Sequence, residues 1–444
     1  MDHAPIDNAG WTPRFYLETY GCQMNVADSQ LIGGQLRRAG YISVDAPEQA
    51  DVILLNTCAI REHAEERVLS RLSELARLKE RQPALRLGLV GCMAQNNRAA
   101  LLSKAPYLDL VAGPDAYRQL PRMLADAGFD PVVDVRLDRN ETYADLDPDW
   151  ESGVRAYVTI MRGCDRFCAF CVVPYVRGRE RSVPIAALMA QLRVLARRGV
   201  REVVLLGQTV NAYRDEAVDF AALLHAAAGV EGIERIRFTS PHPCDMSPAV
   251  IEAMASEAKV QPYLHLPVQS GSDRMLAAMG RGYGVQEYLA LVARLRAAIP
   301  DLALSTDLIV GFCEESAEDF DATLELMRTV QFDSAFTFKY SRRPHTRAAA
   351  RPDSVSETEK ARRLAAVIEL QERISAQRNQ AWVGQVCQVL VEGAARRGDG
   401  LLMGKTPQFK TAVFSTPSQI APGTTVAVRI ESATSHSLLG RALL

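Results

Sequence analysis

Residues 161–171 read MRGCDRFCAFC, and this segment decides the fold. Its cysteines, Cys164, Cys168 and Cys171, follow one another at spacings of four and three. Clusters of the [4Fe–4S] type normally take four cysteine thiolates, so three of them leave one iron open for a ligand from outside the protein. Structural zinc is the alternative, but it prefers paired CxxC units that complete four ligands, and no second CxxC is present. The spacing therefore favours an iron–sulfur cluster.

Length, charge and cysteine usage bound the class of protein. The chain has 444 residues, enough for roughly two to four domains. Its net charge of −2 means that any surface for nucleic acid must be local. The opening MDHAPIDNAG is polar and no run of about 18 apolar residues occurs, so we expect neither a signal peptide nor a membrane span. Nine cysteines, an odd number, favour a reducing cytoplasm and metal chemistry over disulfides.

Strand and helix patterns alternate over residues 14–130. Short apolar runs, FYLETY, DVILLN, LRLGLV and DLVAG, are separated by segments whose apolar residues recur every three or four positions. This alternation predicts an open, parallel α/β domain. We expect residues 1–13 to be a flexible N-terminus. Residues 131–150 contain the acidic stretch DRNETYADLDPDW, and we interpret them as a linker.

The alternation restarts in residues 151–377. Helical stretches separate six strand candidates, RAYVTIM, EVVLLGQ, RIRFTS, YLHLPV, ALSTDLIVGF and DSAFTFKYS. Six β/α units predict a partial (β/α)6 barrel, an open relative of the TIM barrel, and a charged helix near 355–380 trails it. Residues 378–444 differ, because CQVLVEG, KTAVF and TTVAVRI are separated by turn-forming residues. They predict a small all-β barrel at the end of an α/β chain.

Three further cysteines lie in the first domain, each directly after a predicted strand: Cys22 in TYGCQMN, Cys58 in LLNTCAI and Cys92 in LVGCMAQ. The carboxyl ends of parallel strands gather at one edge of a sheet, so these thiolates can converge on a second cluster with one open iron. The alternative is three unrelated cysteines, since free cysteine is commonly buried. Five other candidates are interpreted as structural: Cys244, Cys313, Cys387, His242 and His265.

The two cysteine sets together resemble those of the methylthiotransferases, a radical-SAM family with two [4Fe–4S] clusters. The CxxxCxxC spacing and the aromatic Phe170 are similar to the pattern by which S-adenosylmethionine (SAM) chelates an open iron. YGCQMNVADS, NTCAIRE and GCMAQ resemble the family's N-terminal domain, and the tail resembles a TRAM domain, a β module that binds RNA. Within this family, the chain resembles the MiaB-type tRNA branch most. The segments that carry this resemblance are RGCDRFCAFCVVPYVRGRERS, LLGQTVNAY, LHLPVQSGSDRMLAAMGRGY and STDLIVGF.

The resemblance implies methylthiolation of carbon 2 of N6-(dimethylallyl)adenosine beside the anticodon, at tRNA position 37. It implies two [4Fe–4S] clusters and two SAM molecules per turnover, with the sulfur carried on the cluster of Cys22, Cys58 and Cys92. The implied partners are the tRNA anticodon stem-loop, a sulfur donor and an electron donor such as flavodoxin or ferredoxin, and we expect a monomer. Three alternatives stay open: action on threonylcarbamoyladenosine, action on a ribosomal-protein side chain, and a non-catalytic RNA-binding electron carrier.

The resemblance also places SAM contacts at the strand ends of the barrel: Phe170, Gly207, Gln208, Ser270, Gly271, Ile309, Val310 and Gly311. Each position equally fits ordinary turn chemistry, because Gly and Ser are common at strand ends. The chain departs from the family pattern at Thr209, usually Asn, at GFCEES (311–316), usually GFPGET, and at YSRRPHT (340–346), usually YSPRPGT. These changes alter the backbone freedom of the two loops.

RNA contacts are expected from two basic groups. Arg177, Arg179 and Arg181 would share one face of an extended segment and meet phosphates. The second group combines base stacking with phosphate contacts in the β tail, and consists of Lys405, Phe409 and Lys410. The alternative for both groups is a solvated charged face.

Overall fold

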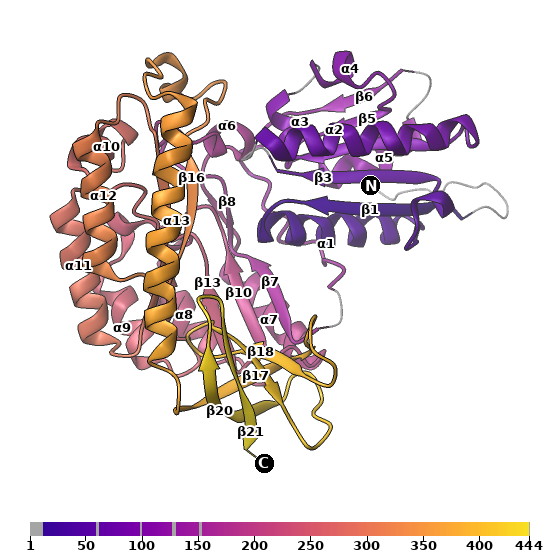
Figure 1. Ribbon diagram of the computed structural model, residues 1–444. Helices are drawn as coiled ribbons and strands as arrows, with labels where there is room; N and C mark the ends of the chain where they lie inside the picture. The colour runs from indigo at the N-terminus through magenta and orange to yellow at the C-terminus, as the bar shows by residue number, and fades with distance from the viewer. Residues whose placement is uncertain (1–11, 59–61, 98–99, 127–129, 151–152, 444) are drawn as a thin grey trace. The chain divides into compact units, whose positions relative to one another are not determined.

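The computed structural model describes residues 12–58, 62–97, 100–126, 130–150 and 153–443 (Figure 1). The chain forms two compact units. The first holds the chain up to residue 151 together with Tyr175–Arg179, and the second holds the remainder. Most of the N-terminus expected to be flexible, residues 1–11, lies outside the described residues. Within the described part of the chain, no helix has both the length and the apolar character needed to cross a membrane.

The first unit is built on a six-stranded sheet in the order β2-β1-β3-β4-β5-β6, with every pair parallel. Its strands are β1 Arg14–Tyr20, β2 Ile42–Ser43, β3 Val52–Thr57, β4 Arg86–Gly91, β5 Leu110–Ala112 and β6 Val132–Asp134. The central strand β3, VILLNT, is buried along its whole length. A continuous apolar strand of this kind is typical of a parallel sheet that is covered on both faces.

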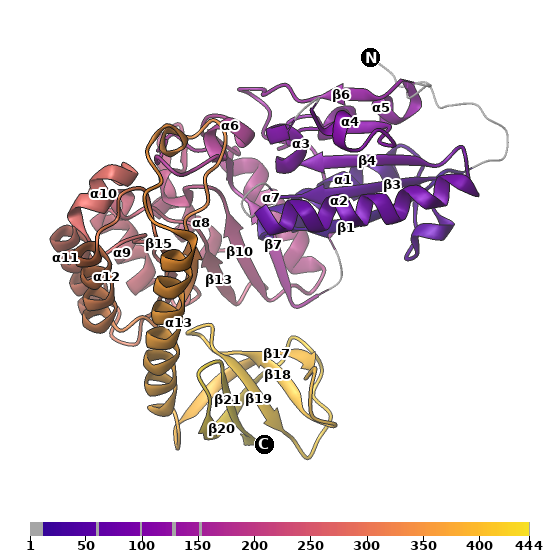
Figure 2. The ribbon, with the colours of Figure 1, turned by 45° about the horizontal axis from the view of Figure 1, so that its top comes forward.

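Helices cover both faces of this sheet, each with its own core (Figure 2). The helices are α1 Gln23–Arg38, α2 Glu62–Ala76, α3 Cys92–Asn97, α4 Ala100–Lys104 and α5 Leu120–Asp126. Apolar residues of α1 and α5 pack on one face, and those of α2, α3 and α4 pack on the other. The predicted parallel α/β domain is therefore confirmed. The edge strands β2 and β6 were not predicted, because two and three residues are too few to show a period.

The prediction of a linker over residues 131–150 was wrong. Strand β6 pairs with β5 and completes the sheet. Tyr143 and Leu146 are buried in the core of the first unit, and the Tyr143 hydroxyl donates to the Pro114 carbonyl at 3.0 Å. The acidic residues of this stretch are also engaged, since Arg118 forms ion pairs with Glu141 and Asp145 at 2.7 and 2.8 Å. Although residues 136–140 are exposed, the stretch is tied to the first unit by these ion pairs and by the buried Tyr143 and Leu146.

The second unit contains the six predicted barrel strands as two parallel three-stranded sheets, β13-β10-β7 and β14-β15-β16. A parallel bridge between Ile236 and Val260 joins the two sheets. The strands are β7 Arg155–Thr159, β10 Glu202–Leu206, β13 Arg235–Phe238, β14 Tyr263–His265, β15 Ala303–Val310 and β16 Ser334–Lys339. The partial (β/α)6 barrel is therefore confirmed.

Helices follow the barrel strands, and short hydrogen-bonding residues begin most of them. The helices are α7 Ile185–Arg197, α8 Phe220–Ala228, α9 Pro248–Ser256, α10 Asp273–Met279, α11 Val285–Ala298, α12 Ala317–Val330 and the trailing α13 Glu357–Gln380. Side chains at the N-caps of five of them accept a backbone N–H, as Ser and Asp caps do: Asp219, Ser247, Ser272, Ser316 and Ser356. Helix α13 lies against β16, where Gln371 donates to the Phe332 carbonyl at 2.9 Å.

The C-terminal residues close into a five-stranded barrel in the order β17-β18-β19-β21-β20 (Figure 2). The strands are β17 Val386–Ala394, β18 Leu402–Lys405, β19 Thr411–Ser415, β20 Thr425–Ala433 and β21 Ser437–Leu443. Their alternate residues form a separate core that includes Val389, Val428 and Cys387. Closure leaves no open sheet edge, and the predicted all-β barrel is confirmed.

A buried polar cluster docks this small barrel onto the amino ends of the strands of the partial barrel. The ring of Phe409 packs at a tilt of 41° against Tyr263, with centroids 5.1 Å apart, and the Arg237 guanidinium lies 4.6 Å from the centroid of the Phe409 ring. Arg237 donates to the carbonyls of Thr406 and Pro407 at 2.9 and 2.8 Å. It also pairs with Glu202 at 2.9 Å, and this carboxylate is fully buried. Such a pair is stable only because its remaining hydrogen bonds are made.

The three residues expected to contact RNA, Lys405, Phe409 and Lys410, take part in this docking cluster, and their contact with RNA stays a prediction that the packing argues against. The side chain of Lys410 is only 9% exposed, and its ammonium pairs with Asp333 at 2.8 Å and also donates to Asn379. The ammonium of Lys405 lies 4.8 Å from the Phe409 ring, inside the same docking cluster. Basic residues beside an aromatic are the pattern of both an RNA surface and a cation–π contact. Tertiary packing selected the second.

Replacing Glu202 with Ala should weaken the docking cluster. Arg237 would lose its carboxylate while it stays buried, and breaking a buried pair in this way costs roughly 3–5 kcal/mol. The midpoint of urea unfolding, followed by circular dichroism, should fall. Replacing Glu231, which is exposed at the surface, is the matched control and should change stability by about 0.5 kcal/mol or less. Equal midpoints for the two variants would contradict the role given to Glu202.

Candidate functional site

Three cysteines lie at one edge of the sheet in the first unit, as predicted. Cys22 follows β1 and stands at the N-cap of α1, Cys58 follows β3, and Cys92 is the first residue of α3 after β4. Strands β1, β3 and β4 are neighbours in the sheet. The Cys58 amide donates to the Tyr20 carbonyl at 3.1 Å, which ties two of the three loops together. None of the three is in a disulfide.

Two glycines let these cysteine loops approach one another. A Cβ on Gly21 would lie 3.0 Å from the Cβ of Cys58, and a Cβ on Gly91 would lie 2.8 Å from the carbonyl oxygen of Thr57 and overlap Asn56. Both glycines have positive φ, +151° and +93°. A residue with a side chain would be strained there and would push the loops apart. The glycines that precede Cys22 and Cys92 in the sequence therefore shape the site.

The electrostatics of the first-unit site are set by one buried cation. The Arg177 Nε donates to the Cys92 sulfur at 3.2 Å, and its Nη2 pairs with Asp28 at 2.8 Å. A hydrogen bond with Cys58, joined by the charge of Arg177, lowers the pKa of Cys22 to about 6 against the opposing effect of burial. Burial raises the pKa of Cys92. A thiolate is the iron-binding form, so the site favours it at Cys22.

The second cysteine set lies on the loop after β8 Met161–Arg162, in the second unit. The Cys171 amide donates to the Cys168 carbonyl at 3.0 Å, which closes a tight turn. The Thr209 hydroxyl lies 3.2 Å from the Cys164 sulfur, and the Gly163 amide donates to the Gln208 side chain at 2.6 Å. The end of β10 thus holds the cysteine loop in place.

Burial raises the pKa of Cys164, and burial raises the pKa of Cys171 to about 12. Loading iron at this loop must therefore release protons. Within the described residues, no three His, Cys, Asp or Glu side chains are arranged to hold one metal ion. A [4Fe–4S] cluster makes no such demand, because each cysteine binds a different iron. The donor sets fit such a cluster: three thiols on neighbouring loops in the first unit, and three on a single loop in the second, with none of the six in a disulfide.

Comparison with known proteins decides the family. The Radical SAM superfamily matches residues 158–327, the TRAM domain matches residues 380–443, and the uncharacterized protein family UPF0004 matches residues 14–113. The tRNA-2-methylthio-N(6)-dimethylallyladenosine synthase of Chlorobium luteolum is 46% identical over 432 residues, covering 96% of each chain. The protein of the same name from Magnetococcus marinus is 45% identical, covering 96% of this chain and 99% of its own.

The chain belongs to the radical-SAM tRNA methylthiotransferase family. Membership brings SAM and a [4Fe–4S] cluster with it. Solved structures agree on the fold at low identity. The radical SAM methyltransferase TsrM from Kitasatospora setae, with tryptophan and a SAM analogue bound, has a TM-score of 0.55 at 12% identity, covering 76% of this chain and 75% of its own. The cobalamin-dependent enzyme OxsB has a TM-score of 0.53 at 14% identity, covering 81% of this chain and 56% of its own.

Four of the residues expected to contact SAM lie near the cysteine loop of the second unit, and their contact with SAM remains a prediction. Phe170 and Ile309 pack on the same hydrophobic cluster, next to the cysteine loop. Gly207 follows β10, and a Cβ there would lie 2.6 Å from the Met161 side chain. Together with Gln208, these residues line the carboxyl ends of the strands around the cysteines, which is where barrel enzymes bind their ligands.

Four other expected SAM contacts also stay predictions, although the packing of the protein already engages these residues. The Ser270 hydroxyl is fully buried 3.3 Å from Thr323 of α12, and the Gly271 amide donates to the same Thr323 hydroxyl at 3.0 Å. Val310 is fully buried within β15, and the Gly311 amide donates to Glu315 at 2.6 Å. Helix packing and turn chemistry, the alternative reading, explain these four positions.

The arginine group expected to meet phosphates does not share a face. Arg177 ends the short helix α6 Val173–Arg177 and is 3% exposed against Cys92, and Arg181 is buried in β9 Arg181–Ser182. Arg179 alone of the three is exposed. The prediction assumed an extended segment, but α6 turns the chain. Arg177 therefore lies at the site for a reason other than the predicted phosphate contact, and a second arginine at a cysteine site, Arg281 in MGRGY (279–283), was not predicted.

The remaining cysteines and histidines have structural roles, as interpreted. The Cys313 thiol is buried 3.6 Å from the Ala348 carbonyl, and Cys244 lies 3.6 Å from the Gly282 carbonyl. Burial, with the charge of Arg281 and Arg166, holds the pKa of His242 at about 2, so this ring stays neutral. His265 bonds the Ser305 hydroxyl at 2.9 Å.

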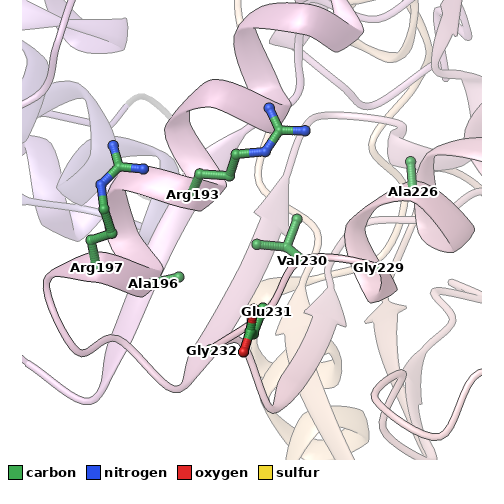
Figure 3. Close-up of a pocket in the computed structure, with 8 residues that line it drawn as sticks. All are labelled: Arg193, Ala196, Arg197, Ala226, Gly229, Val230, Glu231 and Gly232. Atoms are coloured by element: carbon green, nitrogen blue, oxygen red, sulfur yellow. The ribbon is translucent and has the colours of Figure 1, made fainter.

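A hollow of about 610 Å³ lies at the other end of the partial barrel (Figure 3). It is lined by the last turns of α7 and α8 and the loop before β13: Arg193, Ala196, Arg197, Ala226, Gly229, Val230, Glu231 and Gly232. These helices run toward the amino ends of the strands that follow them. The cysteine loop lies at the carboxyl ends, so the hollow is not the cofactor site.

Replacing Gly91 with Ala should damage the first-unit cysteine site. The new Cβ would overlap Asn56 and crowd Thr57. We expect the variant to hold about half of the wild-type iron after anaerobic reconstitution, because two three-cysteine sites of equal capacity share it. Iron is measured by chemical analysis of the purified full chain.

Gly40 provides a matched control for this experiment. Its φ is +90°, close to that of Gly91, but nothing lies within 4 Å of a Cβ placed there. Gly40→Ala therefore carries similar backbone strain without the steric conflict, and it should keep its iron. Full iron in Gly91→Ala, or equal loss in both variants, would contradict the role of Gly91.

Proposed function

We propose that this methylthiotransferase replaces the hydrogen at carbon 2 of N6-(dimethylallyl)adenosine in tRNA, at position 37, with a methylthio group. The observation that carries the proposal is a pair of three-cysteine sites, one in each unit, in a chain whose relatives of that activity match over nearly their whole length. The reaction would take place in the cytoplasm, where thiols stay reduced.

Carbon 2 of adenine has no leaving group, so its hydrogen must be removed as an atom. When bound, a cluster at Cys164, Cys168 and Cys171 supplies one-electron cleavage of SAM, and one at Cys22, Cys58 and Cys92 supplies the sulfur. The protein's part is to leave one iron open at each site and to hold the loops. Thr209 and Gln208 do so for the cysteine loop of the second unit.

The partners follow from this chemistry. An electron donor such as flavodoxin or ferredoxin and a sulfur donor are needed, with two SAM molecules consumed in each turnover. We propose that the RNA contacts the exposed arginines of the TRAM-like barrel, which are Arg396, Arg397, Arg429 and Arg441. The less exposed basic residues of this barrel are already engaged in the docking cluster. Exposed arginines can reach the phosphates of a folded stem-loop.

The substrate can be tested with a matched pair of anticodon stem-loops. One carries isopentenyladenosine and the other carries adenosine in the same sequence. We expect methylthiolation of the first and little reaction of the second, because each buried methylene of the prenyl group contributes about 0.8 kcal/mol. Mass spectrometry of the digested nucleosides measures the product. Equal conversion of both, or preference for threonylcarbamoyladenosine, would count against the assignment.

The two cysteine sites should divide the labour. The wild-type chain should bind about eight irons, and the variant with Cys22, Cys58 and Cys92 replaced by Ala should bind about four. This variant should still cleave SAM to 5′-deoxyadenosine under reduction but make no methylthiolated RNA, since no open iron would hold the sulfur. Replacing Cys164, Cys168 and Cys171 should abolish the cleavage. Methylthiolated RNA from a folded first variant, or zinc in place of iron after anaerobic reconstitution, would overturn the proposal, and a chain that never cleaves SAM would be an electron carrier.

A further inference from the structure

Each cysteine site contains one buried arginine that donates to a cysteine sulfur. In the second unit, Nη1 of Arg281 lies 3.2 Å from the sulfur of Cys168. In the first unit, Nε of Arg177 lies 3.2 Å from the sulfur of Cys92. Both arginines are nearly inaccessible, at 6% and 3% exposed. A guanidinium is always charged, so each site holds a fixed positive charge against one of its iron-binding sulfurs.

Arg281 is held in place by acceptors that do not cancel its charge. Its Nη2 donates to the Pro267 carbonyl at 2.9 Å, and its Nε donates to the Tyr283 hydroxyl at 3.1 Å. The Tyr283 hydroxyl in turn donates to the carbonyls of Pro267 and Val268 at 3.1 and 3.0 Å. These groups fix the plane of the guanidinium. Its remaining donor edge faces Cys168.

Arg177 is held differently, because a carboxylate balances it. Its Nη2 pairs with Asp28 at 2.8 Å, and Asp28 is fully buried. The Tyr117 hydroxyl donates to the same carboxylate at 3.3 Å. The first-unit site thus holds a guanidinium and a carboxylate together, whereas the acceptors that fix Arg281 are neutral. The two sites are electrostatically different although each has three cysteines.

The potential of an iron–sulfur cluster depends on the charge around it and on hydrogen bonds to its sulfurs. Reduction adds one electron and makes those sulfurs more negative, so a nearby cation and N–H donor favour the reduced form. We propose that Arg281 and Arg177 are positioning residues that raise the reduction potentials of the two clusters, each acting on the cluster of its own unit. This inference rests on the proposed function, which supplies the clusters.

The test for Arg281 is a redox titration of the reconstituted full chain, followed by electron paramagnetic resonance. The signal that changes when SAM is added identifies the cluster of the second unit. In Arg281→Gln this cluster should be about tenfold less reduced at the same applied potential, a shift of about 59 mV for one electron. Arg281→Lys keeps the charge without the fork and should shift less. If Arg281→Gln loses iron, the reduction potential measured in Arg281→Lys tests the proposal in its place.

Tyr283→Phe is the matched control, since it removes a partner of Arg281 but not the contact with Cys168. Its potential should stay near the wild-type value. The reduction potential of the first-unit cluster should stay unchanged in all three variants. An unchanged potential in Arg281→Gln and Arg281→Lys, with both clusters present, would overturn the inference and leave the proposed function standing. Absence of clusters from the wild-type chain would instead refute the proposed function.

In the first-unit site, two substitutions should shift the reduction potential of the cluster in opposite directions. Arg177→Gln removes the cation and should make its cluster about tenfold harder to reduce, whereas Asp28→Asn removes the balancing anion and should make it easier to reduce. Both variants disturb the same buried pair, so a merely structural role would move the potential in the same direction or not at all. Opposite shifts support the proposal, and shifts of one sign, or none, contradict it.

Discussion

Parallel pairing of strands gathers the loops that follow those strands at a single edge, and both cysteine sites depend on this constraint. In the first unit, β1, β3 and β4 are neighbours, and each is followed by one cysteine. In the second unit, the end of β10 holds the cysteine loop through Gln208 and Thr209. Strand direction thus brings cysteines that are far apart in the sequence to one edge of the sheet.

The same polarity leaves the amino ends of the barrel strands free for another task. Glu202, at the start of β10, and Arg237, in β13, are buried there beneath the TRAM-like barrel. Phe409 completes the contact with its ring over the guanidinium. The cysteine loop and the docking contact therefore lie at opposite ends of one sheet. A buried ionic cluster can stabilise the docked barrel there without perturbing the cysteine loop.

Buried arginine recurs in each of these places with a different partner. Arg237 faces a carboxylate, Arg177 shares its charge between Asp28 and a cysteine, and Arg281 faces a cysteine and neutral acceptors. A buried cation is costly unless it is paired. Where the partner is a cysteine that would bind a cluster, the pairing would also change how readily that cluster accepts an electron.

Most of the fold could be predicted from the sequence. Apolar runs separated by helical periods predicted the central strands of both units, since burial on two faces imposes a continuous apolar pattern. Edge strands as short as β2 were missed, because two residues carry no period. Residues 131–150 were misread, because acidic composition does not reveal that Arg118 pairs with Glu141 and Asp145.

The candidate site divides in the same way. The sequence alone identified the six cysteines as candidate ligands, from their spacing and from their positions directly after strands. Only the tertiary structure decided that Arg177 is buried, that Lys410 pairs with Asp333, and that Arg281 reaches a cysteine. A charged or polar side chain has many acceptable partners, and which one it meets depends on contacts far apart in the chain. Sequence spacing records the identity of a ligand, whereas the environment of that ligand is set by packing.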